Sequence, residues 1–114
     1  MKILNTSKNS ILAENCSTAD TFFTRFKGLM GVNRLPAGSS LHIVPCNSIH
    51  MLFMKIPLDI VFLDRSNAVV HLIEAIQPWK VSKIVHKAHS VLELPTGTIK
   101  ASGTCIGDQI EFKS

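Results

Sequence analysis

The stretch that decides the fold reads DIVFLDRSNAVVHLIEAI over residues 59–76. Its two apolar runs, residues 59–64 and 69–76, are rich in Ile, Leu and Val, and the polar residues Arg65-Ser66-Asn67 separate them. Short apolar runs on either side of a polar turn are typical of a β-hairpin whose strands are mostly buried. We therefore expect residues 59–76 to form such a hairpin.

Other short extended runs lie on both sides of this hairpin. The polar stretch at residues 6–10 predicts the turn of a first hairpin between residues 2–5 and 11–14. Runs of the same kind, bounded by Pro or Gly, predict strands at residues 41–44, 49–54, 90–94 and 109–112. Many short strands indicate a mainly β (α+β) fold, built as a small, highly curved sheet or barrel.

One helix is predicted, at about residues 18–30. Apolar positions recur there at spacings of three and four, namely Ala19, Phe22, Phe23, Phe26, Leu29 and Met30. Ser17 or Thr18 can cap its start, and Gly31 can end it.

The composition is that of one globular domain spanning residues 1–114. Hydrophobic residues make up 46% and charged residues 18% of the chain, which excludes an intrinsically disordered protein. The net charge of +4 permits an anionic partner without requiring one. With six Phe, one Trp and no Tyr, the chain has few side chains for the base-stacking surface of a single-strand nucleic-acid binder.

Several common sequence signals are missing. No apolar run reaches the roughly 18 residues that a membrane-spanning helix needs, and the N-terminal residues turn polar after Leu4, where a secretory signal would stay apolar. The chain has three widely spaced cysteines, Cys16, Cys46 and Cys105, and no CxxC pair. This pattern indicates reduced thiols rather than a set of disulfides. We therefore expect a cytoplasmic protein. In the absence of a P-loop, GxGxxG, HExxH or zinc-ribbon motif, we assign no cofactor and no metal.

Soft and borderline metal ligands recur at a spacing of four, in His42, Cys46, His50 and Met54. On strands this spacing separates side chains by roughly 13 Å, too far for all four to bind one ion. A bend after Pro45 leaves a two-ligand site of Cys46 and His50 open. The same two residues also suggest a thiol nucleophile and its base, with Asp59 or Asp64 orienting the imidazole, against the alternative of a buried thiol.

A basic segment, Lys80–His89, contains three Lys, two His and no acidic residue. Lys80, Lys83 and Lys87 are its candidate contacts to an anion or a partner, although a solvated loop explains the same composition. Trp79, just before this segment, is expected to cover the core. Glu93 alternates with Leu92 and Leu94 and is expected to face solvent or a nearby Lys.

An ordered set of segments resembles the DUF192 family of small prokaryotic proteins over residues 18–112. The segments are Arg25-Phe26-Lys27-Gly28-Leu29-Met30-Gly31, Leu35-Pro36, Pro45-Cys46, Ile49-His50, Phe53-Met54, the run from Pro57 to Asp64, Val91-Leu92-Glu93-Leu94-Pro95 with Gly97, and Gly107-Asp108. The resemblance implies a compact β-rich, barrel-like domain with one helix and no established biochemical function. It also implies a site, because His50, Met54 and Asp59 match recurring family positions; we take them as a ligand-binding pocket.

Three interpretations follow. The leading one is a non-catalytic small β-barrel that binds a protein partner or a small ligand, as an accessory to a pilus or secretion system, which is where the resemblance places related Pro-Cys proteins. The second is a hydrolase or thiol-dependent enzyme that uses Cys46, His50 and Asp59. The third is a weak nucleic-acid binder that uses the segment Lys80–His89.

Overall fold

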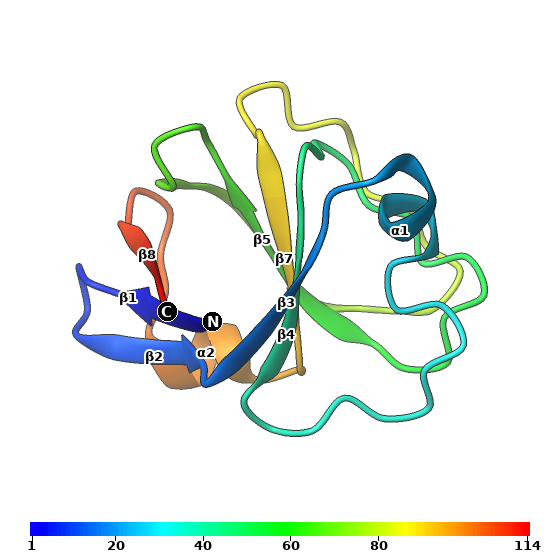
Figure 1. Ribbon diagram of the computed structural model, residues 1–114, viewed down its shortest axis with the longest axis horizontal. Helices are drawn as coiled ribbons and strands as arrows, with labels where there is room; N and C mark the ends of the chain where they lie inside the picture. Colours follow the sequence, from blue (N-terminus) through cyan, green and yellow to red (C-terminus); the bar gives the residue numbers. More distant parts are fainter.

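The computed structural model describes the backbone of residues 1–114 and the side chains of residues 1–21 and 24–114. The chain forms strands in two sheets and two short helices (Figure 1). Their bounds, in chain order, are β1 (Lys2–Asn5), β2 (Ser10–Ala13), β3 (Asn15–Ala19), α1 (Phe22–Lys27), β4 (Ser39–Ile43), β5 (Leu58–Leu63), β6 (Val69–Ile76), β7 (Ser90–Leu94), α2 (Thr98–Ser102) and β8 (Ile110–Lys113).

The strands pair as two open sheets, in the orders β2-β1-β8 and β3-β4-β7-β5-β6. The mainly β class is confirmed, and so is the hairpin of residues 59–76, which is β5 paired antiparallel with β6. The barrel is not confirmed, because the larger sheet ends at β3 on one side and at β6 on the other. The chain changes sheets between β2 and β3, where the N–H groups of Glu14 and Asn15 both donate to the carbonyl of Gly38.

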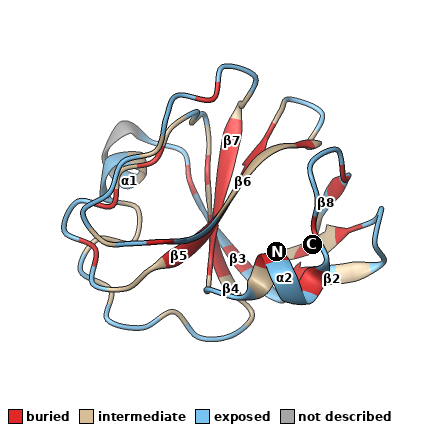
Figure 2. Ribbon diagram, turned by 180° about the vertical axis from the view of Figure 1, so that it is seen from behind, coloured by how far each residue is buried: buried red, intermediate tan, exposed pale blue. Residues whose placement is uncertain are grey.

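The five-stranded sheet is covered on both faces, so β5 and β7 are buried at every position. Alternation along β5 places Ile60 and Phe62 in one hydrophobic cluster and Val61 and Leu63 in another. Figure 2 shows these buried strands between α1 on one side and the β1–β2–β8 sheet with α2 on the other. The residues just after α1 and the loop of residues 46–56 pack against the first cluster.

The helix in the structure, α1, is shorter than the predicted helix of residues 18–30. The residues expected to begin it form β3, which pairs in parallel with β4 along all five positions, so tertiary pairing overrides the local periodicity. Thr21 caps the start of α1 and forms a capping box with Thr24, and Gly28 caps its end. The predicted apolar stripe includes Phe22 and Phe23, whose side chains lie outside the described residues. The helix α2 was not predicted; it lies between Gly97 and Gly103.

Residues 49–54 were expected to be a strand, and the structure places them in a loop. This loop runs beside the loop of residues 77–89, and backbone hydrogen bonds join the two. The N–H of Cys46 donates to His89 over 2.8 Å, and that of Met51 donates to Lys80 over 2.7 Å. Because these loops are paired, residues near 50 and near 80 form one surface beside α1. Neither of the described helices has the length and apolar content that crossing a membrane requires.

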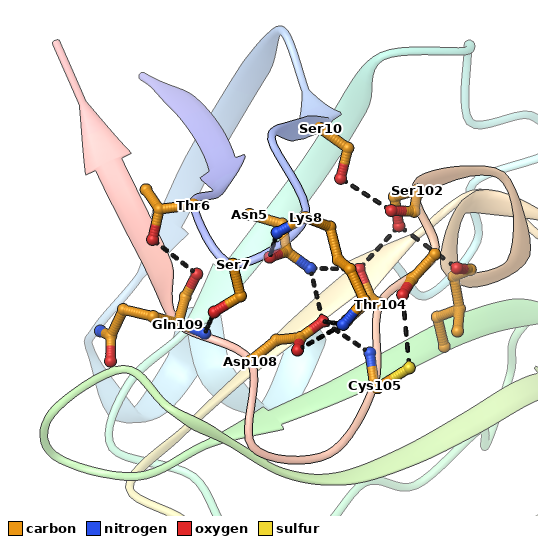
Figure 3. Close-up of polar contacts among 12 residues, drawn as sticks. Asn5, Thr6, Ser7, Lys8, Ser10, Ser102, Thr104, Cys105, Asp108 and Gln109 are labelled. Carbon is orange, nitrogen blue, oxygen red and sulfur yellow. Dashed lines mark hydrogen bonds and ion pairs between the residues drawn. The ribbon is translucent and has the colours of Figure 1, made fainter.

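A polar network joins the two ends of the chain (Figure 3). The Asp108 carboxylate accepts hydrogen bonds from Asn5 over 3.0 Å, Lys8 over 2.7 Å and the N–H of Cys105 over 2.9 Å. Burial by itself would raise the pKa of Asp108, but these hydrogen bonds outweigh it and lower that pKa to about 2. Gly107-Asp108 therefore ties the turn before β8 to the first hairpin.

Candidate functional site

Glu93 lies in β7, the central strand of the larger sheet. Its cross-strand neighbours are Leu41 of β4 and Ile60 of β5, both in the first hydrophobic cluster. Only 3% of Glu93 is exposed. The expectation of a solvent-facing Glu93 is therefore wrong, because the face opposite Leu92 and Leu94 is covered by α1 and the loops that follow it.

The Glu93 carboxyl has one fully buried oxygen atom. Its Oε1 atom has no partner among the described residues, and burial raises the pKa of Glu93 to about 7. Gly28, at the end of α1, allows the helix backbone to lie close to the Glu93 carboxyl. A Cβ built on Gly28 would lie 3.4 Å from Oε1, and the Gly28 backbone, with φ 48° and ψ −124°, suits glycine.

A cavity of about 30 Å³ lies at this carboxyl. Its lining includes Glu93 from β7, Cys46 and His50 from the loop between β4 and β5, Met30 and Met54 as apolar walls, and Arg25 from α1. A space of this volume holds about one water molecule. The site is thus a small polar cavity inside the apolar face of the sheet.

His50 presents a free acceptor at this cavity. Its Nε2 atom lies 3.1 Å from the carbonyl oxygen of Phe26. Because a carbonyl only accepts, Nε2 carries the proton of this bond, and in the neutral imidazole Nδ1 then carries the lone pair. Nδ1 is buried and has no partner in the part of the chain that the structure describes. The imidazole also packs on the Phe26 ring, with centroids 5.3 Å apart, which fixes its orientation.

Cys46 is a protonated thiol in this environment. Burial raises its pKa, and the nearby Glu93 charge raises it further, against the lowering effects of Ser48 and Arg25. Its Sγ donates to the carbonyl of Ser48 over 3.0 Å. A thiol with a raised pKa is a poor nucleophile at neutral pH.

The other predicted site residues lie elsewhere. Asp59 does not line the cavity; its carboxylate accepts from the N–H of Ala75 over 2.9 Å and from that of Ile99 over 3.0 Å, so it joins β5 to β6 and α2. Asp64 accepts from the backbone of the β5–β6 turn. The structure therefore brings together Cys46, His50 and Met54, with Glu93 as the carboxylate beside them.

Of the four residues spaced by four, His42 lies apart from Cys46, His50 and Met54. The His42 ring packs on Phe112, with centroids 4.4 Å apart, and burial, aided by His89, lowers the pKa of His42 to about 4. Throughout the described residues, no three His, Cys, Asp or Glu side chains lie close enough to hold one metal ion.

An open groove of about 530 Å³ adjoins the cavity. The two share Lys27, Met30 and Met54 in their linings. Phe53 and Trp79 line the groove with 61% and 58% of their surfaces exposed, and their rings meet edge to face at 5.0 Å. Trp79 was expected to cover the core, but it lies on the surface instead.

Both aromatic residues have unusual backbone conformations. The φ angle is 62° at Phe53 and 70° at Trp79, values that bulky residues rarely adopt. Backbone hydrogen bonds hold them there: Gly31 donates to the carbonyl of Phe53, and the N–H of Trp79 donates to Met51. Strained and exposed aromatic residues of this kind cluster at binding sites.

The three predicted basic contacts, Lys80, Lys83 and Lys87, are all exposed on the loop of residues 77–89. Lys80 follows Trp79, whereas Lys87 lines a separate hollow with Asp64 and Arg65. Their positions leave the predicted contact to an anion or partner untested.

Comparison with known proteins identifies the family. The DUF192 family, described as uncharacterized ACR, matches residues 3–112. A UPF0127 protein of Thermococcus sibiricus is 36% identical over 119 residues, which covers 97% of this chain and 74% of that protein. A UPF0127 protein of Pyrococcus furiosus is 31% identical over 115 residues and covers 96% of this chain and 97% of that protein.

The fold also recurs in a solved structure. The crystal structure of a protein of unknown function from Novosphingobium aromaticivorans superposes with a TM-score of 0.83 at 23% identity, over 97% of this chain and 82% of that one. Since the family match runs from β1 to β8 and the identity to curated relatives exceeds 30%, the chain belongs to the DUF192 family.

Proposed function

We propose that this protein is a non-catalytic binding module whose groove receives an acidic segment of a protein partner. The observation that carries the proposal is the pair of exposed aromatic side chains, Phe53 and Trp79, beside Lys27 and Lys55. The family resemblance makes a component of a pilus or secretion system the first class of partner to test.

The aromatic pair supplies the apolar part of the recognition. Large exposed aromatic side chains are the usual anchors of protein interfaces, because they bury much area at a low cost in side-chain entropy. Each positive φ angle costs about 1 to 3 kcal/mol at a bulky residue. That strain presents the two rings outward at the rim of the groove.

The lysines supply the charge selectivity. Lys27 and Lys55 line the groove, and its described lining contains no acidic side chain. An acidic partner gains favourable interactions with both ammonium groups, whereas a basic partner is repelled. Met30 and Met54 form the floor, where flexible thioethers adapt to different apolar side chains.

The chemistry of the cavity supports binding rather than catalysis. The Cys46 thiol has a raised pKa, and both carboxylate oxygens of Asp59 accept from backbone N–H groups that hold the fold. The enzyme interpretation needs a thiolate at Cys46 and a carboxylate from Asp59 beside His50.

The single tryptophan makes this proposal testable by fluorescence, since Trp79 lies in the groove itself. We would titrate the protein with an acetylated, amidated peptide Glu-Glu-Leu-Phe-Glu-Glu, and with the same peptide carrying Lys in place of Glu. We expect a saturable change of Trp79 emission with the acidic peptide only. Lys55→Glu should abolish the change, and Phe53→Ser should weaken it at least tenfold.

Ile106→Ser is the matched control, because Ile106 is 64% exposed and does not line the groove. It should leave binding unchanged. Equal responses to the two peptides, or an acidic peptide that binds the Lys55→Glu variant as well as the wild type, would contradict the proposal.

A further inference from the structure

We propose that the cavity between α1 and β7 is a second binding site, specific for one primary ammonium group or ammonium ion. It is built from Glu93 and His50, and this proposal does not depend on the partner proposed for the adjoining groove. The argument rests on three features of the cavity: its unpartnered acceptors, its uncompensated carboxyl and its size.

Two acceptors at the cavity have no donor among the described residues. Glu93 Oε1 and His50 Nδ1 are both buried with no partner among the described side chains and backbone. The thiol of Cys46 donates to Ser48 and is therefore not available to them. Buried acceptors without partners cost free energy, so a ligand that brings its own N–H groups satisfies both.

The ligand should also carry positive charge. The ion pairs found among the described residues are Lys2 with Glu14 and Lys8 with Asp108, so neither involves Glu93. Of the cations that line the cavity, Arg25 donates to the carbonyl of Asp20 over 3.3 Å, and Lys27 is exposed. A water molecule would satisfy the hydrogen bonds, but only a cation would also compensate the buried carboxylate.

The size and surroundings select a monovalent donor. A cavity of about 30 Å³ admits one water-sized group, such as ammonium or the terminal group of a primary amine. The titratable and charged groups that face Glu93 there are Arg25 and Lys27 from α1, with Cys46 and His50 from the loop. The positive charges of Arg25 and Lys27 repel a divalent cation more strongly than a monovalent one.

Thermal unfolding at about pH 8, where the Glu93 carboxyl is ionised, tests the site. Equal ionic strengths of ammonium, methylammonium, potassium and tetramethylammonium chloride would be compared. Potassium matches ammonium in size but has no N–H, and tetramethylammonium is too large and has no N–H. We expect ammonium to raise the Tm by at least about 3 °C over potassium. A rise with ammonium alone supports the free ion, and a rise with methylammonium as well supports the primary amine of a larger ligand.

Two variants separate the site from general salt effects. Glu93→Gln should lose the response to ammonium, whereas Glu111→Gln, which removes an exposed carboxyl from β8, should keep it. As a measurement that needs no variant, ¹⁵N-labelled ammonium should give a bound NMR signal with slowed proton exchange at pH 8, and that signal should disappear at about pH 5.5, where Glu93 is protonated.

Two results would overturn the proposal. A Tm that does not distinguish ammonium from potassium would show that the cavity does not select an N–H donor. A normal ammonium response in Glu93→Gln would show that ammonium acts at another place. The peptide titration of the groove has a separate readout, so either proposal can fail alone.

Discussion

Replacing Glu93 with Gln should change how the stability of the protein depends on pH. In the unfolded chain Glu93 has its ordinary pKa of 4.5, and in the folded protein burial raises that pKa to about 7. Below pH 4.5 Glu93 is protonated in both the folded and the unfolded state, so its burial does not require the desolvation of a charge. As the pH rises from 4.5 to 7, the unfolded state loses its proton first, so the folded state loses stability.

The size of this loss follows from the two pKa values. They differ by about 2.5, and each pKa unit corresponds to about 1.4 kcal/mol. The wild type should therefore lose up to about 3 kcal/mol of unfolding free energy across this interval. That value is an upper limit, because water that enters the cavity stabilises the ionised carboxylate.

His42 changes the unfolding free energy in the opposite direction over nearly the same pH interval. The pH dependence of the wild type alone would therefore hide the effect of Glu93. Burial lowers the pKa of His42 from 6.5 to about 4. The unfolded state therefore binds a proton first as the pH falls, and the stability that neutral His42 provides above pH 6.5 is lost toward pH 4. The two effects nearly cancel in the wild type, and Glu93→Gln exposes the His42 effect.

The assay is urea unfolding at intervals from pH 4 to pH 8, followed by far-UV circular dichroism because Trp79 is already exposed in the folded protein. The quantity of interest is the stability of Glu93→Gln minus that of the wild type. We expect this difference to grow by about 3 kcal/mol between pH 4.5 and pH 7. In His42→Leu, where the opposing effect is removed, stability should fall with rising pH. A difference that stays constant across the interval would refute the inference that Glu93 is a buried, unpartnered carboxyl.

Two further predictions concern the polar network of the termini and the end of α1. In the wild type, Asp108 contributes unfolding free energy that is present above pH 3.8 and is lost as the pH falls toward 2. Asp108→Asn should remove this contribution, which is about 1 to 2 kcal/mol after allowance for the solvent around the exposed Lys8. Acid titration followed by circular dichroism measures it, and an unchanged loss between pH 4 and pH 2 in the variant would contradict the role assigned to Asp108. Gly28→Ala should cost about 1 to 3 kcal/mol, because its φ of 48° and ψ of −124° disfavour a Cβ that would also lie 3.4 Å from Glu93. The matched change Gly103→Ala, at φ 70° and ψ 20° with open space around the new Cβ, should cost about 1 kcal/mol; equal losses in urea unfolding would argue against a special constraint at Gly28.

The sequence predicted the features that depend on near neighbours. The hairpin of residues 59–76 follows from two apolar runs and a polar turn, and both strands form close to the predicted bounds. The first hairpin was also predictable, because its polar turn lies between two short apolar runs. In each case the pattern and the turn lie within a few residues of one another, so the local chain specifies the pairing.

The sequence was a weaker guide where distant segments compete with local preference. The helical spacing from Ala19 onward is genuine, but residues 15–19 pair with β4 instead, and only tertiary structure supplies that partner. The spacing of four grouped His42 with Cys46 and His50, whereas the fold directs His42 toward Phe112. Asp59 and His50 are close in sequence but serve different parts of the molecule.

Glu93 shows which properties the local sequence determines and which depend on tertiary packing. Alternation with Leu92 and Leu94 correctly assigned Glu93 to the opposite face of β7, because side chains of a strand alternate whatever surrounds them. Whether that face meets water depends on α1 and the loop of residues 46–56, which lie tens of residues away in the chain. The sequence by itself therefore determined the two hairpins, their turns and the alternation of side chains along β7. Only the tertiary structure decided which side chains are buried, which aromatic residues are exposed and which acceptors lack donors, because those properties depend on packing between segments that are far apart in sequence.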